Sequence, residues 1–215
     1  MNMKKASLFV IMFAAALSVC GQSRTTKLAV YPEFRPSLIQ LADGRTIKQS
    51  LTNIFLKNSH LLYLQGDQVM EANMKNVLGV KFDDRYYVKI DTLLAYQVDS
   101  VGHDMLYCAT VIDQEAYHAW LKNSQVITNL SLGELIQTTT IDLATEEDHK
   151  FPLINLYYYR YNGQYVRCHE RNLLRILPKE KKRILKTFVT MPDFSWTHED
   201  SLLKLLKGLQ SQTDE

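Results

Sequence analysis

The chain has 215 residues, of which 46% are hydrophobic and 22% are charged, so it can bury a sizeable core and is neither disordered nor collagen-like. Its 25 basic and 23 acidic residues are nearly balanced, which argues against a strongly basic nucleic-acid-binding protein. The length suits one large domain or two small ones.

Residues 1–21 have the three parts of a bacterial-type signal peptide. Lys4 and Lys5 form a positive region, a mostly apolar stretch follows to Val19, and small residues mark a cleavage zone before Gln22. The apolar stretch is shorter than the roughly 20 residues that a membrane span needs. We therefore expect an exported protein, periplasmic or secreted, with no transmembrane span. Without the two lysines, the mature chain carries 23 basic and 23 acidic residues.

A cysteine in this segment allows a second interpretation. Leu17-Ser18-Val19-Cys20 resembles a lipoprotein signal, in which the cysteine is lipidated and becomes the first residue. Val19 departs from the small residue that usually stands there. The alternative to soluble release is a membrane-anchored lipoprotein with Cys20 as its lipidation site.

The first half of the mature chain alternates apolar and polar residues in short runs. Asp43-Gly44, Gly66-Asp67 and the segment 102–104 each separate two such runs and predict β-hairpins. For the turn near residue 84 we predict a three-residue loop, because it opposes Phe82 to Tyr86 and places both apolar sets on one face. This series predicts an antiparallel meander or small barrel-like part.

The second half changes character. The pattern predicts a short helix over 114–122, a polar loop over 132–150, a Tyr-rich hairpin over 155–169, and two helices that begin near residues 178 and 197. We therefore predict a β-rich α+β protein, with a barrel-like part over 24–114 followed by an α+β part over 115–215. The two parts form separate domains or one continuous domain.

The Tyr-rich hairpin is the best candidate contact surface. Asn162-Gly163 favours a type I′ turn, which places the side chains of four residues on the face opposite the core: Tyr158, Arg160, Tyr165 and Arg167. Aromatic rings stack on sugars, and Arg pairs with carboxylates or phosphates. The predicted partner is a glycan or an envelope protein. The alternative is that these residues only stabilise the hairpin through cross-strand pairs.

Cys108 and Cys168 remain after signal cleavage. An oxidising compartment permits a disulfide between them. The alternative is two buried free thiols, since the strand pattern places both side chains on the core side.

Two further patterns suggest surface functions. Asp91-Thr92-Leu93 and Asp99-Ser100-Val101 look like the O-glycosylation acceptor of some Gram-negative bacteria, with Thr92 and Ser100 as acceptors. Residues 171–186 hold seven basic residues and one acidic residue. We expect an amphipathic helix with a solvated basic face there, the alternative being contact with an anionic membrane.

Motifs for catalysis, metals and cofactors are missing. The six histidines lack metal-ligand spacing, and the sequence contains no nucleophile elbow, phosphate-binding loop or dinucleotide fingerprint. We predict no metal and no cofactor. The leading functional prediction is a non-catalytic binding or structural module of the cell envelope, and the alternative is an envelope hydrolase acting on glycans or peptides.

Overall fold

The computed structural model describes residues 24–25, 28–123 and 151–211, so the signal peptide, Cys20 and the predicted loop over 132–150 lie outside the described residues. The strands are β1 (Arg24–Thr25), β2 (Arg35–Leu41), β3 (Thr46–Phe55), β4 (His60–Gln65), β5 (Gln68–Glu71), β6 (Val77–Lys81), β7 (Tyr86–Ile90), β8 (Leu93–Val101), β9 (Asp104–Ile112), β10 (Phe151–Tyr161) and β11 (Gln164–Arg167). The helices are the 3-10 helix η1 (Met74–Asn76), α1 (Gln114–Asn123), α2 (Glu170–Ile176), α3 (Lys179–Val189) and α4 (Glu199–Gln210).

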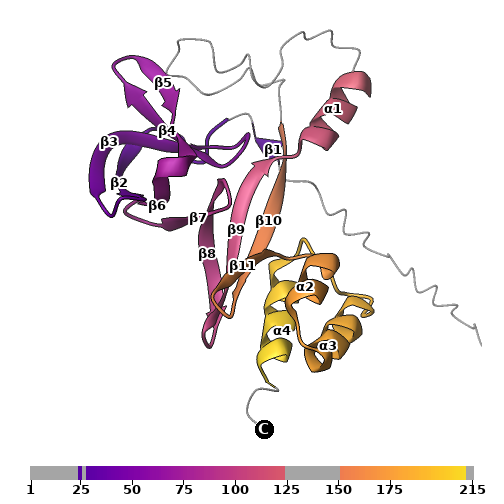
Figure 1. The fold of residues 1–215 in the computed structure, drawn as a ribbon. Helices are drawn as coiled ribbons and strands as arrows, with labels where there is room; N and C mark the ends of the chain where they lie inside the picture. Colours follow the sequence, from indigo (N-terminus) through magenta and orange to yellow (C-terminus); the bar gives the residue numbers. More distant parts are fainter. Residues whose placement is uncertain (1–23, 26–27, 124–150, 212–215) are drawn as a thin grey trace, which may run out of the picture.

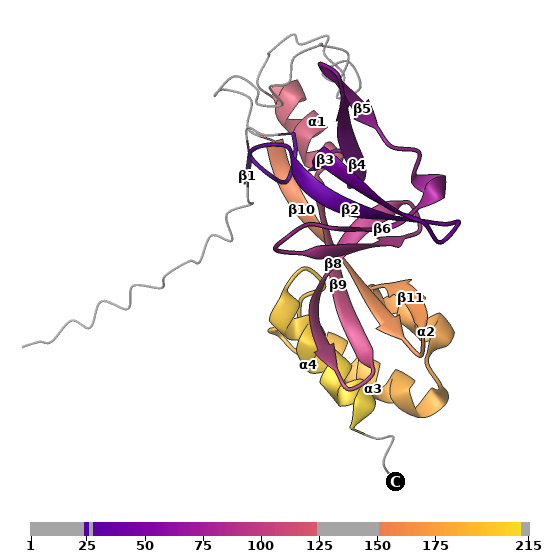
Figure 2. The same cartoon turned by 90° about the vertical axis from the view of Figure 1, so that its left-hand side faces the viewer.

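The described strands form one open antiparallel sheet in the order β1-β10-β9-β8-β7-β6-β2-β3-β4-β5. The free edge of β10 pairs with β1 near its start and with β11 near its end. In Figures 1 and 2, the long strands β8 to β10 connect a curled part of the sheet, built from β2 to β7, with the packed helices α2 to α4. The arrangement confirms the predicted β-rich α+β class.

The Tyr-rich hairpin has the predicted turn and register. Asn162 and Gly163 have φ angles of 49° and 77°, as a type I′ turn requires. Tyr161 lies opposite Gln164, and Tyr159 lies opposite Val166. A local turn signal was therefore sufficient to set the pairing of two strands.

The turn between β6 and β7 differs from the prediction. It has two residues, since the Phe82 N–H donates to the Arg85 carbonyl over 2.9 Å. The prediction assumed that the apolar side chains of β7 share one face. Instead, Tyr87 packs into the core of the curled part, while Ile90 belongs to a separate buried cluster. Because β7 is buried on both faces, its alternation does not identify a single core side.

The sheet curls until the turn after β3 contacts strands β8 and β9. The Ser59 hydroxyl donates to the Leu94 carbonyl over 2.6 Å, and the Leu94 N–H donates to the Ser59 carbonyl over 2.9 Å. The Ile112 N–H donates to the Leu56 carbonyl over 2.6 Å. Ser59 is buried and has a φ of 53°. The hydrogen-bond ladder stays open, but these contacts give the curled part its barrel-like shape.

The C-terminal helices cover one face of β8 to β11. The apolar side chains of α4 pack there against Tyr157, Tyr159 and Tyr161. The Tyr159 hydroxyl donates to the Leu202 carbonyl over 2.6 Å in a fully buried contact. At the other end of α4, the Gln210 side-chain amide donates to the buried Asp104 carboxylate over 3.0 Å. The helix is thus held at both ends.

Two details of the helices correct the sequence prediction. Helix α2 is separate from α3 and begins after His169, whose ring nitrogen accepts from the Arg171 N–H over 3.3 Å. Helix α4 has His198 at its N-cap position instead of the predicted Thr197. Histidine is an uncommon cap, so neither start carries the usual sequence signal.

Replacing Tyr159 tests how the helices are attached. We expect Tyr159→Ala to lower the free energy of unfolding by about 3–5 kcal/mol, because a large core side chain is lost. Tyr159→Phe removes only the hydroxyl and should cost about 1 kcal/mol. Urea unfolding measures both changes. Equal stability of wild type and Tyr159→Ala would contradict the packing of α4 on this face.

Candidate functional site

The predicted Tyr/Arg surface is only partly open. Tyr158 lies opposite Arg167, and Arg160 lies opposite Tyr165, as predicted. Tyr165 and Arg167 are exposed, but Tyr158 is only 6% exposed and packs with Tyr107. The expectation that all four side chains form an accessible surface is wrong for Tyr158. The helices lie on the opposite face, so the bend of the sheet itself buries this ring.

Two of the remaining residues of this surface contact side chains of β9. The rings of Tyr165 and Tyr107 are 5.5 Å apart and nearly perpendicular, and the Arg160 guanidinium lies 3.9 Å from the Met105 sulfur. Burial, together with the nearby Tyr165, raises the pKa of Tyr107 to about 12. These contacts favour the interpretation that the pairs stabilise the hairpin.

Cys108 and Cys168 are both free and buried. Cys108 lies opposite Tyr157 on one side of β10, and the Cys168 N–H donates to the Tyr157 carbonyl on the other side. The cysteines therefore lie two strand spacings apart, and each spacing is about 4.8 Å. Their Cα atoms are thus farther apart than the roughly 7 Å that a disulfide can span. The structure supports two buried thiols and does not support the disulfide.

A second cluster of Tyr and Arg residues lies where the β6–β7 turn and strands β7 and β8 meet on the concave side of the curled sheet. The Arg85 guanidinium lies over the ring of Tyr96, 4.2 Å from its centroid. The rings of Tyr87 and Tyr96 are 5.9 Å apart. Burial raises the pKa of Tyr96, so its hydroxyl stays protonated. The Tyr96 ring thus holds the Arg85 cation in place.

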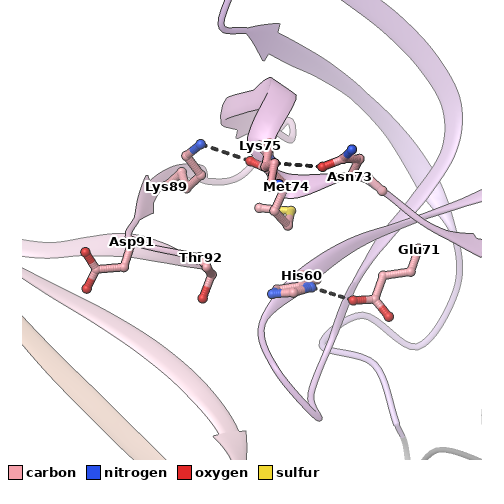
Figure 3. A pocket seen from close by; sticks show the side chains of 9 residues that line it. His60, Glu71, Asn73, Met74, Lys75, Lys89, Asp91 and Thr92 are labelled. Atoms are coloured by element: carbon pink, nitrogen blue, oxygen red, sulfur yellow. Dashed lines mark hydrogen bonds and ion pairs between the residues drawn. The ribbon is translucent and has the colours of Figure 1, made fainter.

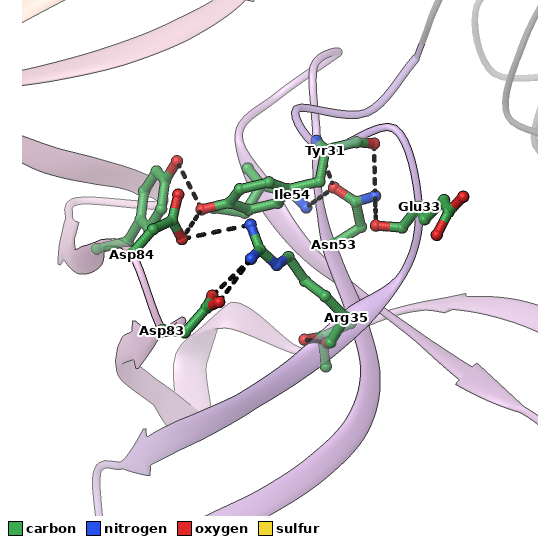
Figure 4. Close-up of polar contacts among 9 residues, drawn as sticks. Tyr31, Glu33, Arg35, Asn53, Ile54, Asp83 and Asp84 are labelled. Atoms are coloured by element: carbon green, nitrogen blue, oxygen red, sulfur yellow. Dashed lines mark hydrogen bonds and ion pairs between the residues drawn. The ribbon is translucent and has the colours of Figure 1, made fainter.

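The acids next to Arg85 in the sequence are paired elsewhere. The Arg35 guanidinium lies 2.7 Å from the Asp83 carboxylate and 3.4 Å from that of Asp84. It also lies over the ring of Tyr31, which hydrogen-bonds to Asp84 (Figure 4). Among the described residues, no ion pair includes Arg85. Arg85 is therefore the cation of this cluster that lacks a carboxylate partner.

Arg85 borders a hollow of about 230 Å³. Tyr87, Tyr96 and Thr110 line it together with apolar side chains such as Leu153. We call this space the Arg85 hollow. The Thr110 hydroxyl donates to the Asn155 side-chain oxygen over 2.8 Å, so the guanidinium is the group that can bind an oxyanion, beside an aromatic wall that suits a small organic ligand.

A larger and more open groove, of about 510 Å³, lies on the β4–β5 side of the sheet. His60 Nδ1 and the Glu71 carboxylate form a close hydrogen bond on one wall, and the Asn58 amide donates to the same carboxylate over 2.8 Å. Figure 3 shows this pair across the groove from Asp91 and Thr92. A carboxylate that holds one ring nitrogen of a histidine orients the other nitrogen, as in metal sites and general bases.

Thr92 and Ser100, the predicted O-glycosylation acceptors, are both exposed. Thr92 stands in the turn between β7 and β8, next to Asp91, whose φ is 55°. Glycosylation at either residue stays a prediction.

Two negative results apply to the described residues. Within residues 24–25, 28–123 and 151–211, no helix is long and apolar enough to cross a membrane. In the same ranges, no group of three or more His, Cys, Asp or Glu residues is placed to hold a metal ion.

Comparison with protein families, curated proteins and solved structures finds no significant match. The functional interpretation therefore depends on the chemistry of the sites.

The sequence contained a signal for the Arg85 hollow. A two-residue turn at Asp83-Asp84 places Arg85 and Tyr87 on the concave face, and β8 then places Tyr96 opposite Tyr87. The three-residue loop that we predicted turns these side chains outward. By contrast, His60 and Glu71 are brought together by the tight β4–β5 hairpin, which was predicted, although their pairing was not recognised.

The buried thiols lead to a prediction on pH. Burial raises the pKa of the Cys108 thiol above its ordinary value of 9.0. Burial raises the pKa of the Cys168 thiol well above the same value. The folded state therefore holds these protons more tightly than the unfolded chain. The resulting stabilisation is fully present below pH 9 and is lost as the pH rises through the raised values. We expect urea midpoints to fall between neutral pH and about pH 10 in wild type, and less in Cys108→Ser with Cys168→Ser. Rapid maleimide labelling of the native protein would contradict the burial.

Proposed function

We propose that this protein is a non-catalytic binding module of the cell envelope that holds a carboxylate-bearing sugar in the Arg85 hollow. The observation that carries the proposal is the Arg85 guanidinium, which is held over Tyr96, lacks a carboxylate partner among the described residues, and borders a small hollow. A guanidinium binds a carboxylate through two parallel hydrogen bonds.

The hollow also favours a ring-shaped ligand. Tyr87 and Tyr96 offer aromatic contact. Its volume of about 230 Å³ suits one sugar ring rather than a folded partner surface. This agrees with the predicted glycan partner. Export itself is a prediction from residues 1–21.

Binding measurements with matched ligands and variants test this proposal. We expect oligogalacturonate to bind the wild-type protein in calorimetry, and the uncharged sugar of the same ring type to bind far more weakly. Arg85→Gln should weaken binding at least about tenfold, through loss of a charge-assisted contact, and should change stability by less than about 1 kcal/mol because the side chain is exposed. Arg85→Lys keeps the positive charge but loses the planar guanidinium that makes two parallel hydrogen bonds. Its affinity for the ligand should therefore lie between those of wild type and Arg85→Gln.

Arg45→Gln is the matched control, because Arg45 is an exposed arginine whose ion pair with Asp43 lies on another hairpin. Inorganic phosphate and an acetylated dipeptide serve as the other oxyanion sources. Unchanged affinity in Arg85→Gln, or a preference for phosphate or the dipeptide, would contradict the sugar carboxylate.

The alternative, an envelope hydrolase, has one observation in its favour. His60 is oriented by Glu71 at the wall of an open groove that also contains Asp91 and Thr92. Such a histidine can accept a proton from water or a hydroxyl group. Turnover of glycoside or peptide substrates that disappears in His60→Gln would replace the binding proposal with this one.

A further inference from the structure

Helix α3 carries a row of cations on its outer face. Lys179, Lys182, Arg183 and Lys186 follow the spacing i, i+3, i+4, i+7, which places them in one stripe. Three of them are exposed and Lys182 is half-buried. We call these four residues the basic stripe. On the opposite side of the helix, Leu185 is fully buried in the core.

The basic stripe is not neutralised by the protein. No ion pair within the described residues includes any of the four cations. Residues 170–211 contain nine basic and five acidic residues, whereas residues 28–112 contain eight basic and nine acidic residues. The positive charge of the described chain is therefore concentrated on the helical end of the molecule.

The packing of α3 on α4 directs the stripe away from the protein. Gly208 of α4 lies so close to α3 that a Cβ atom there would be 2.7 Å from the Phe188 ring. Lys181, which is outside the stripe, lies over the ring of Tyr161 at 5.4 Å and so faces the core. The exposed cations Lys179, Arg183 and Lys186 consequently face solvent together on a fixed helix.

We propose that the basic stripe binds the surface of a bilayer that contains anionic phospholipids. The stripe is straight and about 10 Å long, which suits several headgroups in a plane. Met191, just beyond the C-terminal end of α3, is 40% exposed and adds an exposed apolar side chain near the end of this helix. The balanced charge of the mature chain argues against a nucleic-acid partner. This contact is independent of the Arg85 hollow.

Vesicle co-sedimentation of the mature chain tests the proposal. We expect binding to phosphatidylcholine vesicles that contain phosphatidylglycerol, no binding to phosphatidylcholine alone, and loss of binding in high salt. The variant Lys179→Gln, Arg183→Gln, Lys186→Gln should lower the partition coefficient at least about tenfold, because each cation contributes severalfold.

The control variant removes three exposed lysines far from α3 in the sequence, two in the sheet and one in η1: Lys48→Gln, Lys81→Gln and Lys75→Gln. It loses the same charge and should bind nearly as wild type does. Circular dichroism checks that both variants fold. Failure to bind anionic vesicles, equal loss in the two variants, or tighter binding to double-stranded DNA or heparin than to vesicles would each overturn the proposal.

Discussion

The shape of this protein depends on the contact between Ser59 and Leu94. In the order of the sheet, β7, β6, β2 and β3 separate β4, which follows Ser59, from β8, which contains Leu94. Two hydrogen bonds join these residues, and a third joins the same turn to Ile112. Each contributes about 0.5–1.5 kcal/mol, whereas the left-handed conformation of Ser59 costs roughly 1–2 kcal/mol. The three bonds together, with the burial of the turn, outweigh the strain.

This contact places the two candidate sites on either side of one turn. Ser59 lines the Arg85 hollow, and the next residue, His60, lines the open groove. The chain passes from the turn into β4 between these two residues, so one short segment contributes to both sites. The β7–β8 pairing places Arg85 diagonally over Tyr96, and the curl of the sheet adds Leu56 and Ser59 to the wall of the same hollow. The chemistry proposed for the hollow therefore follows from the curvature of the sheet.

Local signals predicted much of the fold, because a turn such as Asn162-Gly163 restricts the backbone regardless of what surrounds it. Burial on both faces of a strand was harder to predict. Tyr87 and Ile90 face different clusters, so the alternation in β7 suggested the wrong turn and hid the position of Arg85. The burial of Tyr158 was missed for a related reason. A bend of the sheet covers that ring, and the sequence pattern within one hairpin contains no sign of it.

Native-state hydrogen exchange of the Leu94 and Ile112 amides tests the closing contact most directly. Both donate to carbonyls of the turn after β3, across the curl of the sheet. If the contact holds the sheet curled, both amides exchange only through global unfolding, with an opening free energy close to the total stability. The Val69 amide, in the short edge strand β5, provides the comparison and should exchange sooner. Exchange of Leu94 as rapid as that of Val69 would show that the sheet opens freely, and would contradict the account.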